Sequence, residues 1–137
     1  MKRGLFLPIL VLLLAGLALA GCRKGAPIND LSHTFPPTSG QFTAAKVEDA
    51  IIRAGTDLGW QITRVRPGEM EGAIMVRGKH RVQVSIPYDV ANKTYGIKYK
   101  SSINMEYNAE ERKIHPNYNS WVQRLDTAIA NEISRIQ

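Results

Sequence analysis

The side chains that could carry chemistry are few and widely spaced in this sequence. It has one cysteine, Cys22, and three histidines, His33, His80 and His115. A nucleophilic triad needs a base within hydrogen-bond reach of the nucleophile and a third group that orients the base. None of the three histidines belongs to a recognised nucleophile motif. We therefore predict no catalytic residues and no enzyme activity.

Metal and glycosidase chemistry lack their usual patterns as well. Zinc needs closely spaced Cys, His or carboxylate ligands, whereas this sequence has no pair of histidines at helical spacing and no Cys-x-x-Cys. A glycosidase needs two carboxylates across a cleft. The available Glu69, Glu71, Glu110 and Glu111 cluster in predicted turns, where a solvating role is expected. The sequence predicts neither a metal nor a cofactor.

The cysteine stands at the end of a segment with an organisation of its own. Two basic residues precede an apolar run over residues 5–20, and Leu19-Ala20-Gly21 leads into Cys22. A basic region, an apolar region and a small-residue processing site, in this order, are typical of a secretory signal peptide. A transmembrane helix is the alternative, but the run is shorter than the roughly 20 residues that cross a bilayer. We predict export.

Leu19-Ala20-Gly21-Cys22 resembles the lipobox of bacterial lipoproteins. The resemblance implies cleavage between Gly21 and Cys22, a diacylglycerol on the Cys22 thiol and acylation of the new amino group. A single cysteine in an exported chain cannot form an internal disulfide, which fits this role; a plain cleaved signal peptide is the alternative. Arg23 and Lys24 follow, without the aspartate of enteric lipoproteins retained in the inner membrane, so the resemblance favours the outer membrane, facing the periplasm.

The sequence divides into three parts on this interpretation. Residues 1–21 are the cleaved signal peptide, 22–42 are the lipidated cysteine with a flexible tether, and 43–137 are one domain. The tether is rich in Pro, Gly, Ser and Thr without a helical or strand period, and 20 flexible residues have an r.m.s. span of roughly 25 Å. The domain must fold on its apolar core alone, and it is long enough to bury one.

Hydrophobic periodicity predicts a helix, several strands and a second helix in the domain. Thr43 is placed to cap a helix over residues 44–58, and Gly59 to end it. The second helix runs from about 118 to 136. Period-two alternation predicts strands over 60–66, 72–77, 80–88 and 94–101, with turns at Pro67-Gly68 and Gly78-Lys79. Ile103, Met105 and Tyr107 either extend the last strand past a bulge or form a short fifth segment.

The expected fold class is therefore α+β. It is a two-layer sandwich in the order helix, three or four antiparallel strands, helix. Each helix has one apolar stripe, which is most simply buried if both helices pack on one face of the sheet.

The segment His115-Pro116-Asn117-Tyr118-Asn119 allows two interpretations. Its imidazole, amides and phenol lie beside a predicted helix start, where they are able to hydrogen-bond a sugar or a peptide. Alternatively, Pro116 sets the turn and Asn117 or Asn119 caps the helix. Together with Gly59-Trp60 and Pro67-Gly68, the sequence from Ile114 to Val122 resembles a group of small proteobacterial lipoproteins without an assigned role, and this resemblance implies no activity.

The strand region carries the basic charge of the domain. The full chain has a net charge of +6, and basic residues outnumber acidic ones between residues 60 and 100. If the helices cover one face, alternation places Arg81, Gln83, Lys98 and Lys100 on the other. This face is a candidate binding site for an anionic envelope component or an acidic protein, and a solvated sheet face is the alternative. An exported protein rarely meets nucleic acid, so none is expected as a partner.

From these observations we expect a lipid-anchored protein of the cell envelope that acts by binding, as an accessory or assembly factor. The alternative from another class is a small hydrolase, or an inhibitor of one, that acts on cell-wall glycan. A concave pocket with converging polar groups favours the enzyme, whereas a charged face favours the binding protein.

Overall fold

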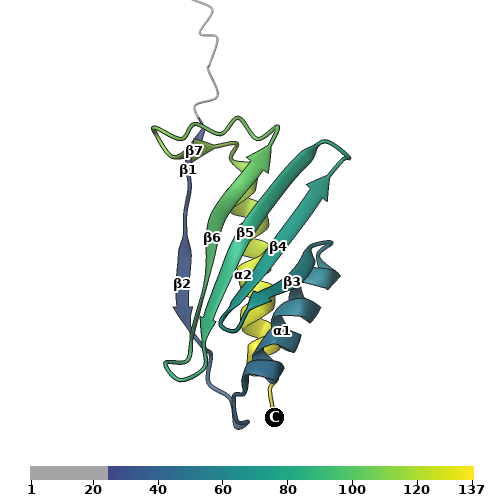
Figure 1. Ribbon diagram of the computed structural model, residues 1–137, viewed down its shortest axis with the longest axis vertical. Coiled ribbons are helices and arrows are strands. Elements are labelled where there is room, and N and C mark those ends of the chain that lie inside the picture. The colour runs from purple at the N-terminus through teal and green to yellow at the C-terminus, as the bar shows by residue number, and fades with distance from the viewer. Residues whose placement is uncertain (1–24) are drawn as a thin grey trace, which may run out of the picture.

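A five-stranded antiparallel sheet and two helices form most of the part of the chain that the computed structural model describes, residues 25–137 (Figure 1). The candidate processing and lipidation residues Gly21 and Cys22 lie outside this range. The sheet has the strand order β2-β6-β5-β4-β3, and a second sheet pairs β1 with β7. The predicted α+β class with antiparallel strands is confirmed.

The elements follow the order expected for the domain, with three additions: β1 and β2 at the N-terminal side and β7 before the second helix. The bounds are β1 Ala26–Pro27, β2 Leu31–Thr34, α1 Ala44–Asp57, β3 Gln61–Arg66, β4 Glu69–Val76, β5 His80–Asp89, β6 Thr94–Ile103, β7 Lys113–Ile114 and α2 Asn117–Ser134. No helix among these residues is long and apolar enough to cross a membrane.

The two helices begin differently. Thr43 caps α1 as predicted: its backbone is extended and its hydroxyl accepts a hydrogen bond from the Lys46 amide. Gly59 follows the end of α1 with φ +83°, a conformation that glycine adopts without strain. The predicted Asn cap of α2 is wrong, because Pro116 occupies that position and makes no side-chain capping bond.

One buried cluster joins the apolar stripes of both helices to the inward side chains of the central strands. It includes Ile51 from α1, Leu125 and Ile129 from α2, and Val84 from β5, all with no exposed surface. In Figure 1, α2 runs behind the sheet, and α1 packs against α2 and β3. Both helices and the sheet therefore share one hydrophobic core.

The strands differ from the predicted ones mainly at their ends. β4 begins at Glu69, so Glu69 and Glu71 are strand residues rather than the predicted turn residues. Pro87 lies within β5, which continues to Asp89. The turn before β5 is centred on Arg77 and Gly78, both with positive φ, one residue earlier than predicted. A bulge lies at Lys100, earlier than predicted, because Gln83 pairs with Ser101 and Val84 with Tyr99. β6 ends at Ile103, so the predicted extension through Met105 and Tyr107 is wrong.

The predicted flexible tether over residues 22–42 is wrong for residues 26–34. β2 pairs with β6, with Leu31 opposite Ile97 and Thr34 opposite Thr94, and Phe35 after it is buried. Backbone hydrogen bonds to β6 stabilise this segment. It therefore needs no apolar pattern of its own. The domain therefore begins near Ala26 and not at residue 43.

Candidate functional site

The predicted basic face is the face of the sheet that points away from the buried cluster. Arg81, Gln83 and Ser85 alternate with the buried Val82, Val84 and Ile86 along β5. The register places Lys98 opposite Ser85, and the bulge between Gln83 and Val84 places Lys100 beside Ser101. The structure thus brings the four predicted residues, Arg81, Gln83, Lys98 and Lys100, onto one face.

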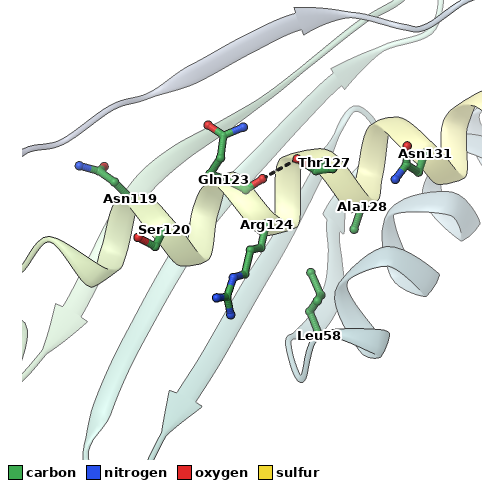
Figure 2. A pocket seen from close by; sticks show the side chains of 8 residues that line it. All are labelled: Leu58, Asn119, Ser120, Gln123, Arg124, Thr127, Ala128 and Asn131. Atoms are coloured by element: carbon green, nitrogen blue, oxygen red, sulfur yellow. Dashed lines mark hydrogen bonds between the residues drawn. The ribbon is translucent and has the colours of Figure 1, made fainter.

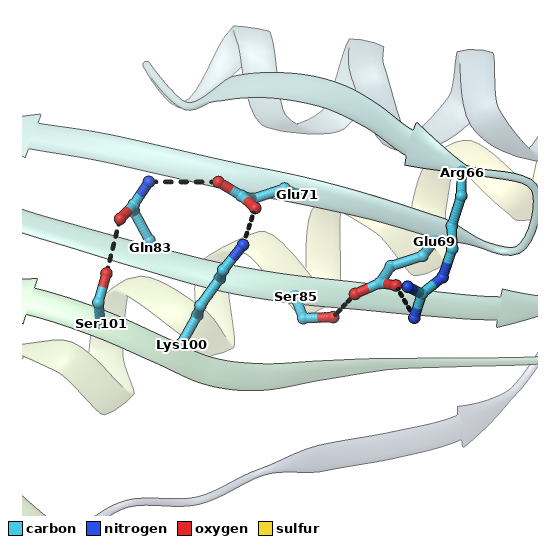
Figure 3. Close-up of polar contacts among 7 residues, drawn as sticks. All are labelled: Arg66, Glu69, Glu71, Gln83, Ser85, Lys100 and Ser101. Carbon is cyan, nitrogen blue, oxygen red and sulfur yellow. Dashed lines mark hydrogen bonds and ion pairs between the residues drawn. The ribbon is translucent and has the colours of Figure 1, made fainter.

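Polar side chains on this face bond to one another in two groups (Figure 3). In the first, the Lys100 ammonium contacts Glu71, which accepts a hydrogen bond from the Gln83 amide at 3.2 Å. The Ser101 hydroxyl in turn donates to Gln83 at 2.6 Å. These bonds cross β4, β5 and β6, so they fix the orientation of Gln83 and neutralise Lys100.

The second group lies nearer the β3–β4 turn. Arg66 and Glu69 form an ion pair at 2.5 Å, and the Ser85 hydroxyl donates to Glu69 at 2.8 Å. The sequence-based interpretation missed both carboxylates on this face because it assigned them to a turn. Two of the four predicted face residues, Arg81 and Lys98, make neither an ion pair nor a side-chain hydrogen bond with any described residue.

A shallow groove of about 750 Å³ follows the outer side of α2 (Figure 2). Its lining is mostly neutral: amides and hydroxyls of α2, the apolar Leu58, and one cation, Arg124. The Thr127 hydroxyl is already bonded to the Gln123 carbonyl at 3.0 Å. The groove presents few groups that could orient a ligand.

Asn119, from the segment that allowed two interpretations, holds the N-terminal part of the domain. Its amide donates to the Pro27 carbonyl at 2.9 Å and its side-chain oxygen accepts from the Asn29 amide at 3.3 Å. Asp30 adds an ion pair with Arg112 at 3.1 Å and accepts from the Tyr99 amide at 3.0 Å. Asn119 therefore serves neither as a helix cap nor as a free ligand group.

The other residues of that segment lie around a cavity of about 420 Å³ at one end of the sheet, which we call the end cavity. The polar or aromatic side chains that line it are Arg77, His80, His115, Asn117 and Trp121. They come from the β4–β5 turn, the start of β5, the connection after β7, and α2. Tyr118 is fully buried instead, and its hydroxyl has no hydrogen-bond partner.

The remaining histidine, His33 on β2, contacts a buried carboxylate. Its Nε2 lies 3.3 Å from one oxygen of Asp126, and the Tyr95 hydroxyl donates to the other at 2.8 Å. Burial, followed by the bond to Asp126, raises the pKa of Tyr95, so the phenol stays a donor. Because both carboxylate oxygens are engaged, this cluster fastens β2 and β6 to α2.

Residues 25–137 contain no cluster of three side chains suited to hold a metal ion. The sequence matches no protein-family model and no curated protein.

Proposed function

We propose that this protein is a lipid-anchored component of a bacterial cell envelope that acts by binding, as an accessory or assembly factor. The signal-like segment before Cys22, with its resemblance to a lipobox, supports the anchor. By the same resemblance the anchored domain faces the periplasm from the outer membrane. The proposed partner is an anionic envelope component or an acidic protein.

The observation that carries the binding role is the open outer face of the sheet. Its central side chains are held in place by the bonds around Glu69 and Glu71, whereas Arg81 and Lys98 extend from it without a described ionic partner. Oriented neutral groups beside available cations provide both hydrogen bonds and charge complementarity to an anionic surface. Lys100 contributes less than its charge suggests, because Glu71 neutralises it.

A binding role suits the described geometry better than a hydrolase. The carboxylate–imidazole pair that most resembles a catalytic dyad is Asp126 with His33, and it connects three elements of the fold. A hydrolase also needs a nucleophile in hydrogen-bond reach of the base, and the described polar contact of His33 is with Asp126.

The anchor is tested by intact mass and membrane fractionation of the wild type beside Cys22→Ala. We expect acyl chains on a chain that begins at Cys22, and loss of that mature form in the variant. In the same cells, crosslinked neighbours should be recovered from the wild type and lost from Arg81→Glu/Lys98→Glu. Arg124→Glu, an exposed charge reversal on α2, is the matched control. Equal recovery from all three proteins contradicts the binding face, and an unacylated mass contradicts the anchor.

A further inference from the structure

The first strand, β1, lies close in sequence to the candidate lipidation site. Ala26 of β1 follows Cys22 by four residues, and a fully extended chain of that length spans at most about 14 Å. β1 is held by pairing with β7 and by the bond from Asn119 to Pro27. An acyl chain on Cys22 would therefore keep this end of the domain at the bilayer surface, instead of letting it move on a long tether.

The end cavity lies at this same end of the molecule. Figure 1 shows β1, β7, the β4–β5 turn and the start of α2 together at one end, and the chain's C-terminus at the other. The cavity is lined by residues of the β4–β5 turn and of the start of α2. Its volume of about 420 Å³ is within the usual range for small-ligand sites, which is roughly 300–1,000 Å³.

Hydrogen bonds assign the protons of the two imidazoles in the cavity. Nδ1 of His80 lies 2.8 Å from the Asn104 carbonyl, which can only accept, so Nδ1 carries the proton. Nδ1 of His115 accepts from the Asn117 amide at 3.1 Å, so His115 carries its proton on Nε2. His115 thus has an Nε2–H to donate, Nε2 of His80 is left as an acceptor, and Arg77 forms no ion pair among the described residues; all three residues line the cavity. These donors suit a phosphate.

Exposed apolar side chains lie at the same end of the sheet as the cavity, on the outer face. Met75 and Ile103 are 55% and 56% exposed, and the register places them on either side of Arg81. Lys79 adds a cation in the adjacent turn. Apolar side chains among basic ones are typical of surfaces that sit at the boundary of lipid headgroups and acyl chains.

We propose that the end cavity binds the phosphate of an anionic phospholipid in the bilayer that holds acylated Cys22, with Met75 and Ile103 at the acyl boundary. The inference rests on the proposed lipid anchor and adds to it a fixed orientation of the domain. The β4–β5 turn contacts the bilayer, and the loop after β6 does not. That loop carries the carboxylates of Glu106 and Glu110, which an anionic surface repels. Arg77 supplies the charge and His115 the neutral donor.

The orientation is tested on the acylated full protein in vesicles. Acylated Cys22 has no free thiol, so an introduced cysteine is the one site available to a bimane label. Ile103→Cys reports the proposed contact, and Val65→Cys, 50% exposed on β3 near the β3–β4 turn, is the matched control. In vesicles that contain phosphatidylglycerol and brominated lipid, we expect quenching at position 103 and little at 65. Equal quenching at both positions, or none at 103, overturns the inference.

The headgroup contact is tested by Arg77→Asn in the Ile103→Cys protein. Asn tolerates the positive φ of this position, so the turn is preserved while the charge is removed. We expect the ratio of docked to undocked protein to fall about fivefold, the effect of one basic residue near an anionic surface. Arg124→Asn, in the middle of α2, should leave the ratio unchanged.

Four further outcomes separate the sources of failure. Quenching that is as strong in pure phosphatidylcholine overturns the anionic-headgroup assignment. Displacement by millimolar inorganic phosphate overturns the lipid as the ligand in favour of free phosphate. The intact mass is recorded first: an acylated protein that does not dock overturns this inference alone, whereas an unacylated Cys22 overturns the anchor and the inference with it.

Discussion

Two buried tyrosines in this core differ in whether the hydroxyl has a hydrogen-bond partner. The Tyr95 hydroxyl donates to Asp126 at 2.8 Å, whereas the hydroxyl of Tyr118 has no partner. Burial raises the pKa of both phenols. A satisfied buried donor stabilises a fold, and an unsatisfied one costs its desolvation.

The two Tyr→Phe variants should therefore differ. Tyr95→Phe leaves a buried oxygen of Asp126 without its donor, which we expect to lower the free energy of unfolding by about 1–3 kcal/mol. Tyr118→Phe removes a hydroxyl that makes no bond, so its stability should equal or exceed that of the wild type. Urea unfolding of the three proteins measures both values. A comparable loss in the two variants would show that Tyr118 has a partner after all.

At the scale of elements, α1 is fitted to β3 at a glycine. A Cβ on Gly55 would lie 2.3 Å from Cγ1 and 2.5 Å from Cδ1 of Ile62. The sequence shows Gly55 as a weak point of a helix, and the structure shows that it allows the close approach of α1 and β3.

Gly55→Ala should therefore destabilise the domain although alanine favours a helix. We expect a loss of about 1–3 kcal/mol from overpacking. In the Ile62→Ala background the clash is absent, and the same change should stabilise by up to about 1 kcal/mol through helix propensity. Chemical denaturation of the four proteins in this cycle gives the coupling. A Gly55→Ala effect of the same sign in both backgrounds contradicts the packing argument.

The two helices are also joined by charge, through Arg53 of α1 and Glu132 of α2 at 2.9 Å. The bond from Arg53, with a smaller contribution from Arg135, lowers the pKa of Glu132 below its ordinary value of 4.5. A lowered carboxyl pKa stabilises the fold above the unfolded value, and this stabilisation is lost as the pH falls through the folded value.

Glu132→Gln should consequently be less stable than the wild type at pH 7, and the difference should shrink below pH 4.5. Because the Arg53 side chain is 54% exposed, solvent screening limits the effect to about 1 kcal/mol or less. Thermal unfolding of both proteins between pH 7 and pH 3 measures it. A difference that stays constant over this range excludes the ionic contribution.

The elements that the sequence predicted well are those whose side chains alternate between core and solvent. β5 shows a strict period of two, and α1 has both its stripe and the Thr43 cap. β2 was missed because Leu31 is its one apolar side chain and its stabilisation comes from backbone bonds to β6. Backbone hydrogen bonds do not depend on the type of side chain, so the sequence of β2 does not reveal them.

For the candidate site as well, the sequence predicted only what depends on the alternation of side chains between core and solvent. Alternation placed Arg81, Gln83, Lys98 and Lys100 on one face. The bonds from Glu71 to Gln83 and Lys100 depend on the register of β4 against β5 and on the bulge in β6. The end cavity depends on how the 104–116 connection returns to α2, which no local pattern contains.

At the scale of the whole molecule, the sheet is assembled from segments far apart in the chain. The N-terminal β1 and β2 pair with β7 and β6, so the segment nearest Cys22 is an outer part of a finished structure. Loss of the proposed anchor in Cys22→Ala would therefore change where the domain resides without removing a contact described within it.

The late pairing of β2 also sets an order of events in biosynthesis. Ser32 pairs with Gly96, and a non-local contact of this kind cannot form until the intervening chain has been made. The residues of β1 and β2 are therefore synthesised before the strands that pair with them. An enzyme that modifies Cys22 would thus have an unpaired stretch of chain to work on while the rest of the domain is still being synthesised, and the docking of β2 afterwards would draw the finished domain down to the membrane.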